Sequence, residues 1–477
     1  MSVAAFNALS PASLPRVKSR SGLTSICLLG ADITAVVIVA AMMVLFVDRW
    51  FDLWKEFLLA QTAMMVIFAG LELYPGCGLS PARELREIFT GATISHGLAA
   101  SAFFVWRPAE TMLSAGICFS WSATLILIVL SRSAVRHLCA EKPWWGVPAV
   151  IFGSGQTARS VLRHIRAYPS TGLRIVAVFE DFCPAWPELD QSDLFVTRRS
   201  HASFYALNLG VTHAIVALPD ARGSEIRALI KSDARYFKQL LVVPDLAGLC
   251  SMWVGTRDLG GMLGLHISQT LLHRGPQLFK RAFDLLLAGT ASLLLLPGFG
   301  LIALAIAITS PGPVVYGQKR IGRHNTRFTA WKFRSMCANA DEVLAHHLET
   351  NPALRSEWER DHKLKNDPRV TAVGRFLRKT SLDELPQLWN VLKGEMSLIG
   401  PRPIVDAEIV RYGDSFDSYQ SVRPGISGMW QVSGRNNTSY GERVQFDEYY
   451  VTNWSIWLDL YIIGRTVKTV LLREGAY

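Results

Sequence analysis

The chain has 477 residues, half of them hydrophobic, and a formal net charge of +10. This apolar content is high for a purely soluble protein, so we expect two or three domains with at least one in a membrane, and we assign the positive charge to cytoplasmic loops, lipid headgroups and phosphates. Seven scattered cysteines form no CxxC pair and no Cys/His cluster, so the sequence indicates neither a disulfide framework nor a zinc site.

Four apolar stretches occupy the first part of the chain, at residues 23–47, 57–74, 88–106 and 112–130. Each has about 18–25 residues, enough to cross a hydrocarbon core of roughly 30 Å. They predict a four-helix transmembrane bundle within residues 1–140. Basic residues place the N-terminus and the chain after residue 131 in the cytoplasm. These residues are Arg16, Lys18, Arg20, Arg83, Arg86, Arg132, Arg136 and Lys142.

The middle of the chain has the pattern of a nucleotide-binding fold. A short apolar strand at 148–154 leads into the glycine turn GSGQTA at 153–158, and a helical pattern follows. The next strand, at 175–179, leads to Glu180 and Asp181, about where a ribose-binding acid would lie. Further strands are expected at 214–218 and 240–243. This alternation predicts a Rossmann-like parallel α/β domain over residues 146–265.

Two interpretations of the glycine turn remain open. It could bind a dinucleotide, or its glycines could serve only the tight turn of a degenerate Rossmann-like domain. We favour the second, because one GxGxxA motif is a weak signal. The domain is then expected to regulate the chain or to mediate self-association, and we expect a homodimer.

A further apolar run begins at residue 283 and is interrupted by Pro297-Gly298-Phe299-Gly300. Proline removes a helix hydrogen bond and clashes with the preceding turn, so a membrane break is expected at Pro297. Lys280 and Arg281 precede the run, and basic residues from Lys319 onward follow it, which favours both ends being cytoplasmic. We therefore predict a re-entrant helix over residues 283–309, with a fifth full span as the alternative.

Two adjacent carboxylates, Asp383 and Glu384, lie among several arginines in the C-terminal part of the chain. Arginine forks match phosphate oxygens, and adjacent carboxylates can hold Mg²⁺, which in turn binds phosphate. The alternative is structural, because Ser381 and Glu384 match a helix capping box. Pro386 argues against that register, and capping would not explain the arginines. The pattern therefore favours chemistry on a nucleoside diphosphate.

Three motifs resemble one known family. They are KFRSM at 332–336, TSLDELPQLWNVLKGEMSLIGPRP at 380–403 and RPGISGMWQVSGRN at 423–436. In these motifs the chain resembles the monotopic phosphoglycosyl transferases, the bacterial sugar transferase family. The resemblance implies a mainly helical catalytic domain over residues 275–477. It departs from the family at the membrane break, where Leu296 stands in place of the usual serine before Pro297.

The resemblance also implies an activity. Asp383 would attack the β-phosphate of a UDP-sugar and release UMP, with Glu384 assisting and Mg²⁺ held by both carboxylates. The aspartyl phosphosugar would then pass hexose-1-phosphate to undecaprenyl phosphate. Further phosphate-binding residues are expected at Lys332, Arg334, Arg378, Arg402, Arg423 and Arg435.

The expected partners are thus a UDP-sugar, undecaprenyl phosphate and the lipid bilayer, with no nucleic acid. The expected place is the bacterial inner membrane, with the catalytic domain on its cytoplasmic face. The SGRN sequence after WQV favours galactose over glucose by family analogy. The step would be the first membrane reaction of O-antigen, capsule or exopolysaccharide synthesis.

Two other functions are weighed against this one. A membrane-attached nucleotide-sugar dehydratase should carry a Tyr-x-x-x-Lys pair, and no tyrosine in the chain has a lysine four residues later. A non-catalytic polysaccharide assembly protein would not need the dense group of carboxylates and arginines.

Overall fold

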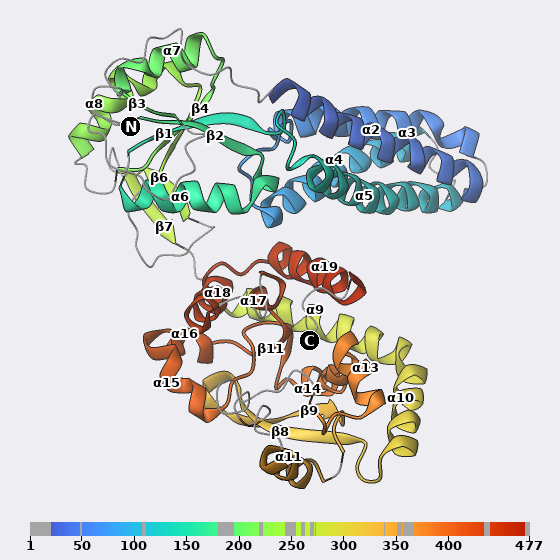
Figure 1. The fold of residues 1–477 in the computed structure, drawn as a ribbon. Helices are drawn as coiled ribbons and strands as arrows, with labels where there is room; N and C mark the ends of the chain where they lie inside the picture. Colours follow the sequence, from blue (N-terminus) through green and yellow to red (C-terminus); the bar gives the residue numbers. More distant parts are fainter. Residues whose placement is uncertain are drawn as a thin grey trace. The chain divides into compact units, whose positions relative to one another are not determined.

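The computed structural model describes residues 21–47, 50–106, 111–153, 155–179, 195–218, 223–243, 254–258, 263–267, 271, 273–337, 339–350, 355, 367–433 and 439–472. The chain forms two compact units, residues 1–248 and 249–477 (Figure 1). The first contains a helical bundle and a parallel sheet, and the second contains the three C-terminal motifs.

Four long helices begin the first unit: α2 (Ser21–Phe46), α3 (Trp50–Gly70), α4 (Pro81–Trp106) and α5 (Thr111–Cys139). Within the described residues, all four are long and apolar enough to cross a membrane, as the sequence predicts. Their inward sides pack around buried residues such as Met64 and Phe68, whereas large apolar side chains also remain on the outside. An apolar outer surface is suited to lipid rather than to water. Helices α4 and α5 extend past the predicted stretches into polar residues, because a helix does not have to end where its apolar part ends.

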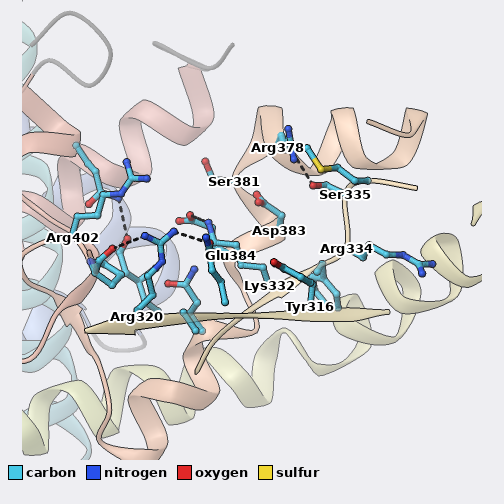
Figure 2. Close-up of a pocket in the computed structure, with 18 of the residues that line it drawn as sticks. Tyr316, Arg320, Lys332, Arg334, Ser335, Arg378, Ser381, Asp383, Glu384 and Arg402 are labelled. Atoms are coloured by element: carbon cyan, nitrogen blue, oxygen red, sulfur yellow. Dashed lines mark hydrogen bonds and ion pairs between the residues drawn. The ribbon is translucent and has the colours of Figure 1, made fainter. Parts of the chain in front are cut away.

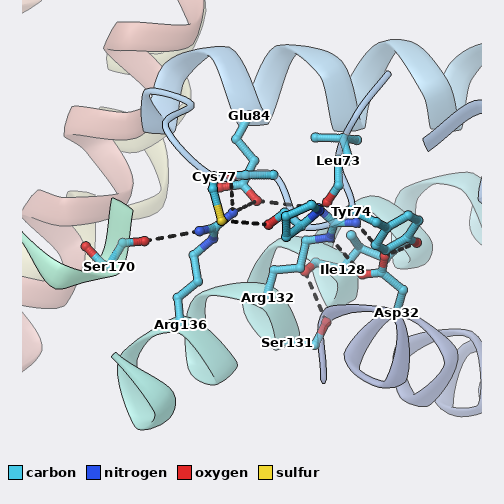
Figure 3. A network of polar contacts seen from close by, with 12 residues as sticks. Asp32, Leu73, Tyr74, Cys77, Glu84, Ile128, Ser131, Arg132, Arg136 and Ser170 are labelled. Carbon is cyan, nitrogen blue, oxygen red and sulfur yellow. Dashed lines mark hydrogen bonds and ion pairs between the residues drawn. The ribbon is translucent and has the colours of Figure 1, made fainter. Parts of the chain in front are cut away.

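A buried ion-pair network joins these helices at one end of the bundle (Figure 3). Arg132 of α5 donates from Nε and Nη2 to the two carboxylate oxygens of Asp32 in α2, at 2.8 and 2.6 Å, and the side chains are 2% and 0% exposed. Glu84 of α4 accepts from Arg136 at 2.9 Å, and Arg136 also donates to the backbone carbonyl of Ser170 at 3.1 Å. From the sequence, both arginines were expected only to indicate topology. In the structure Arg132 joins helices of the bundle, and Arg136 ties the bundle to the α/β domain.

Replacing Arg132 with methionine is expected to lower the free energy of unfolding of the first unit by about 3–5 kcal/mol, because it leaves Asp32 buried without its counter-charge. Thermal unfolding of the purified protein in detergent measures this. The double variant Asp32→Leu with Arg132→Met removes both charges and should recover most of the loss. A double variant that is no more stable than the single one would contradict the explanation.

The α/β domain follows the bundle and has a five-stranded parallel sheet in the order β3-β2-β1-β4-β5. Buried clusters on its two faces are centred on Phe152 with Phe179 and on Ile151 with Leu162. Its strands are β1 (Val147–Phe152), β2 (Leu173–Phe179), β3 (Phe195–Thr197), β4 (His213–Val216) and β5 (Gln239–Val242); its helices are α6 (Gln156–Ala167), α7 (Ala202–Leu207) and α8 (Gly223–Ser232), with short 3₁₀ turns η2 (Pro169–Thr171), η3 (Arg199–His201) and η4 (Ala234–Tyr236). The predicted parallel sheet is present, and the three-residue β3 was too short to be predicted from periodicity.

The glycine turn has a structural reason of its own. Gly153 has a φ of +113°, and a Cβ at this position would lie 2.4 Å from the backbone oxygen of Ala217. Only glycine therefore permits the close approach of the strand ends, with or without a ligand. Glu180 and Asp181, the predicted ribose-binding pair, lie outside the described residues.

The second unit starts with an antiparallel pair, β6 (Val254–Asp258) and β7 (Leu263–Ile267), which is separate from the five-stranded sheet. Its other strands form two small sheets: β8 (Val315–Ile321) is antiparallel to β9 (Arg327–Phe333), and β10 (Ser397–Ile399) is parallel to β11 (Gly425–Ser427). Most of the remainder is helical: α9 (Arg274–Leu294), α10 (Leu296–Thr309), η6 (Arg323–Asn325), α11 (Ala340–Thr350), α13 (Ala372–Thr380), η7 (Leu382–Glu384), α14 (Gln387–Lys393), η8 (Asp406–Glu408), α15 (Ile409–Tyr412), η9 (Gly413–Ser415), α16 (Phe416–Gln420), α17 (Met429–Ser433), α18 (Tyr440–Thr452) and α19 (Ile456–Leu472).

Helices α9 and α10 form a bent pair, with an angle of 60° between them. The break lies at Leu295, and Pro297 occupies the first turn of α10 rather than the break itself. Proline is tolerated in a first turn, where its missing N–H would have no helical partner. The pair is apolar enough to lie in a membrane, either as one broken span or as a re-entrant segment.

Candidate active site

A cavity of about 760 Å³ opens in the second unit (Figure 2). Its walls come from β8, β9, α13, η7 and the loop after β10, which are far apart in the sequence. Six of the predicted site residues line it: Lys332, Arg334, Arg378, Asp383, Glu384 and Arg402. The structure therefore brings parts of all three motifs together around one polar space, the third through Gly425, Ile426, Trp430 and Gln431.

One wall is the β8–β9 hairpin, of which only Lys332 was predicted as a site residue. Side chains alternate between the two faces of a strand, so Tyr316, Gln318 and Arg320 of β8 share one face. In the antiparallel register Tyr316 lies opposite Lys332 of β9. All four residues line the cavity. Hydrogen-bonding side chains at every second position of YGQKR, namely Tyr316, Gln318 and Arg320, were the signal that could have revealed this wall.

The two carboxylates lie in a tight turn between two helices. Helix α13 ends at Ser381, which has left-handed backbone angles (φ 55°), and the 3₁₀ turn η7 carries Asp383 and Glu384. Helix α14 begins after Pro386, and neither Ser381 nor Asp383 makes a side-chain capping hydrogen bond there. The capping-box alternative is therefore wrong. Both carboxylates line the cavity instead.

Burial and neighbouring charges set the protonation behaviour of Asp383. Glu384 accepts a hydrogen bond from the ammonium of Lys332 at 2.5 Å. Burial and then the negative charge of Glu384 raise the pKa of Asp383 to about 6, and the positive charges of Lys332 and Arg378 partly offset this. Asp383 is thus an anion above about pH 6 in a cavity otherwise rich in cations.

Three of the arginines in the lining, Arg320, Arg378 and Arg402, add further positive charge. Arg378, at the end of α13, donates from Nε to the hydroxyl of Ser335 at 2.9 Å. Arg320 donates to the side-chain oxygen of Gln318 at 2.7 Å. The guanidinium of Arg402 lies 5.3 Å from the centre of the Trp430 ring. Burial lowers the pKa of Arg402, yet arginine stays protonated at neutral pH, so all three can bind phosphate oxygens.

The other predicted phosphate-binding residues lie differently. Arg334 lines the cavity, but its guanidinium donates to the carbonyls of Ser310 and Pro311 after α10 and is directed away from Asp383 in Figure 2. Arg423 is not part of the lining and donates to the Gly394 carbonyl at 2.7 Å. Arg435 lies outside the described residues.

The side chains that could act as metal ligands fit a magnesium ion only in part. Among the described residues, no group of three or more carboxylate, histidine or cysteine side chains could hold a metal. Asp383 and Glu384 are adjacent, and the charge of Glu384 adds to burial in raising the pKa of Asp383. Mg²⁺ is commonly bound by one or two carboxylates with water and substrate phosphates completing its octahedron. The pair therefore fits an ion that arrives with a phosphate substrate.

A cationic cavity around paired carboxylates, in a chain with membrane-length apolar helices, is the arrangement of a membrane transferase that handles phosphate groups. The family model for bacterial sugar transferases matches residues 275–473, and that for a CoA-binding domain matches residues 73–244. The undecaprenyl-phosphate galactose phosphotransferase of Salmonella typhimurium is 38% identical over 83% of this chain and 82% of its own. The chain belongs to the bacterial sugar transferase family.

Two other relatives bracket this similarity. The UDP-glucose:undecaprenyl-phosphate glucose-1-phosphate transferase of Escherichia coli is 30% identical over 84% of both chains. An exopolysaccharide production protein of Rhizobium meliloti is 48% identical over 42% of this chain, which is 88% of its own length. That relative matches over only 198 residues, close to the 199 that the sugar transferase model covers.

Proposed function

We propose that this protein transfers hexose-1-phosphate from a UDP-sugar to undecaprenyl phosphate and releases UMP. The observation that carries the proposal is Asp383, an ionisable carboxylate in a cavity with Lys332, Arg320, Arg378 and Arg402. A transferring phosphate needs a nucleophile and neutralisation of its charge, and this cavity supplies both. The names of the full-length relatives support the same reaction class.

The reaction proceeds in two displacements at one phosphorus atom. A carboxylate oxygen of Asp383 attacks the β-phosphorus, the bond from that phosphorus to the bridging oxygen breaks, and UMP leaves with the electron pair. The resulting aspartyl hexose-phosphate is then attacked by a phosphate oxygen of undecaprenyl phosphate, which releases the Asp383 carboxylate. Lys332 holds Glu384 beside the reacting group, and Arg320, Arg378 and Arg402 bind phosphate oxygens.

Magnesium belongs to the same proposal. Asp383 and Glu384 would hold it, and when bound it neutralises charge on the diphosphate. Glu384 remains beside Asp383 and assists attack.

The donor is proposed to be UDP-galactose, for the first membrane step of O-antigen, capsule or exopolysaccharide synthesis. The 38%-identical relative is named for galactose and the 30%-identical one for glucose. Purified protein given UDP-galactose and UDP-glucose separately should release UMP and form lipid-linked sugar with galactose. Formation of product only from UDP-glucose would overturn the choice of sugar, and no UMP from either would overturn the reaction.

The catalytic domain is proposed to lie on the cytoplasmic face of the inner membrane, with α9 and α10 re-entrant. Basic residues on both sides of the pair and the 60° bend near Pro297 support this topology. Single cysteines introduced at Arg274 and His324, in a chain without its own cysteines, should both be labelled from the cytoplasm. Labelling of the second site from the periplasm would show a full span instead.

The rate of UMP release should fall as the pH drops through about 6, because protonated Asp383 cannot attack phosphorus and its pKa is raised to about 6. Lys332→Met removes a charge that lowers this pKa, so the acid limb should move to higher pH. The measurement is kcat/KM for UDP-sugar against pH, which reports groups of the free enzyme. Arg327→Met is the control, since Arg327 is exposed and pairs with Asp406. If the acid limb of the profile does not move in Lys332→Met, the assignment of that limb to Asp383 is contradicted.

A further inference from the structure

Arg423 belongs to a second, smaller cavity in the same unit. This cavity, of about 30 Å³, is lined by three arginines, Arg281 of α9, Arg323 of η6 and Arg423 before β11. None of the three lines the catalytic cavity. The third sequence motif therefore contributes a basic group to a place that the proposed reaction does not use.

Part of this arrangement is a helix cap. Arg281 donates to the carbonyls of Val391 and Leu392 at 2.6 and 2.9 Å, and Arg423 donates from Nε to that of Gly394 at 2.7 Å. These carbonyls end helix α14, where cations are favourable. The cap leaves donors unused, because neither Nη of Arg423 has a partner among the described residues.

Arg323 closes the other side of the cavity. It donates from Nε to the carbonyl of Ser421 at 3.0 Å and from Nη2 to the side-chain oxygen of Gln277 at 3.1 Å. Its Nη1 has no partner within the described part of the chain. Two of the three guanidinium groups thus keep free N–H donors at one small space.

Positive charge exceeds negative charge at this cavity. Lys280 and Asp284 also line it, so the lining has four cations and one carboxylate. Among the described residues, none of the three arginines has a carboxylate within ion-pair distance. Asp284 lies 3.9 Å from the ammonium of Lys280 and accepts from the Ser397 hydroxyl at 2.7 Å, and Asp459 accepts from Lys280 at 2.8 Å. Burial and the charge of Arg423 both lower the pKa of Arg323, as expected for like charges held together. An anion would relieve this repulsion.

The apolar face of α9 indicates which anion is available to this cavity. Leu278, Phe279 and Leu286 are 71%, 56% and 66% exposed, so one face of α9 is apolar and suited to lipid. Arg281 lies in the same two turns, near the polar start of the helix, with its head group turned to the protein. Basic residues at this level of a membrane meet the phosphates of lipid headgroups.

We propose that Arg281, Arg323 and Arg423 form a phosphate-binding site separate from the catalytic cavity, which takes the phosphodiester of an anionic membrane lipid. Arginine forks bind phosphate oxygens in pairs. A space of about 30 Å³ has room for roughly two water-sized groups, so one or two phosphate oxygens enter while the rest of the headgroup stays outside. Because α14 runs from Gln387 in the catalytic cavity to this site, a bound headgroup also steadies the helix that follows the two carboxylates.

The test uses the full chain in nanodiscs that contain no undecaprenyl phosphate. Replacing part of the phosphatidylcholine with phosphatidylglycerol should raise the Tm of the wild type by about 2–4 °C. Arg323→Gln should lose this gain. Arg327→Gln is the matched control, because it removes the same charge from a nearby exposed arginine that pairs with Asp406 outside the cavity, and it should keep the gain.

A second measurement, in detergent with inorganic phosphate, distinguishes a lipid phosphate from a soluble one. A larger Tm gain for wild type than for Arg323→Gln there, without a matching difference in nanodiscs, would assign the site to a soluble phosphate. An equal gain for wild type, Arg323→Gln and Arg327→Gln under both conditions would overturn the proposal. If Arg323→Gln does not fold, Arg323→Lys keeps the charge but loses the fork, and should retain less than the full gain. A full gain in Arg323→Lys with no bound lipid in native mass spectrometry would also overturn it.

Discussion

Replacing Asp383 with asparagine is expected to lower kcat on the order of 10⁴–10⁶-fold, the range for removal of a covalent nucleophile or its base in a well-studied hydrolase. Asparagine has nearly the same shape but no charge and a much weaker oxygen nucleophile. The half-buried turn that holds Asp383 makes no side-chain cap there, so the fold should tolerate the change. The loss would therefore be chemical rather than structural.

The covalent step gives this prediction a direct readout. Wild-type protein given UDP-sugar without undecaprenyl phosphate should release about one equivalent of UMP per active site and retain hexose-phosphate on the peptide that holds both carboxylates. Asp383→Asn should give neither. Asp406→Asn, the same substitution at an exposed carboxylate, should behave as wild type. An adduct on Glu384, or sequential kinetics with no adduct, would show that Asp383 is not the nucleophile.

Replacing Glu384 with glutamine is expected to slow turnover roughly 10²–10⁴-fold, the range for loss of an assisting acid–base group. The change also removes the carboxylate that accepts from Lys332 and one of two proposed magnesium ligands. Unlike Asp383→Asn, it leaves the attacking oxygen in place, so labelled hexose-phosphate should still be trapped on Asp383, only more slowly.

Glu384→Gln should also change the pH dependence of kcat/KM, in a direction that can be predicted. The negative charge of Glu384 raises the pKa of Asp383, so its removal should lower that pKa below about 6. The acid limb of kcat/KM should then move to lower pH, opposite to the shift expected for Lys332→Met. Two shifts in the same direction would show that the limb belongs to another group. Full activity in Glu384→Gln would remove Glu384 from the mechanism.

Several features of the molecule follow from local sequence patterns. The length of an apolar run determines whether a helix can cross a bilayer, so helices α2 (Ser21–Phe46) and α4 (Pro81–Trp106) were predictable from the stretches at 23–47 and 88–106. The glycine turn after β1 was equally local, because its backbone angle excludes other residues. Asp383 and Glu384 were found because they are adjacent and lie within a long family motif.

Other features depend on contacts between distant segments. Arg320 and Lys332 face one cavity because β8 pairs with β9 in one register, and Asp383 reaches it from a turn some fifty residues further on. Nothing in the sequence around Arg423 distinguishes a substrate-binding arginine from one that caps α14. The sequence around Asp32, in the first apolar helix, likewise does not predict its ion pair with Arg132.

The sequence by itself thus determined the membrane-length helices, the parallel α/β pattern, the family and the two carboxylates, since each depends on residues close together in the chain. Only the tertiary structure decided which arginines share the cavity with Asp383 and which gather around the second cavity at the end of α14. The physical reason is that a guanidinium behaves alike in any local sequence context, and its role is set by the carbonyl, carboxylate or open space that packing across the fold brings to it.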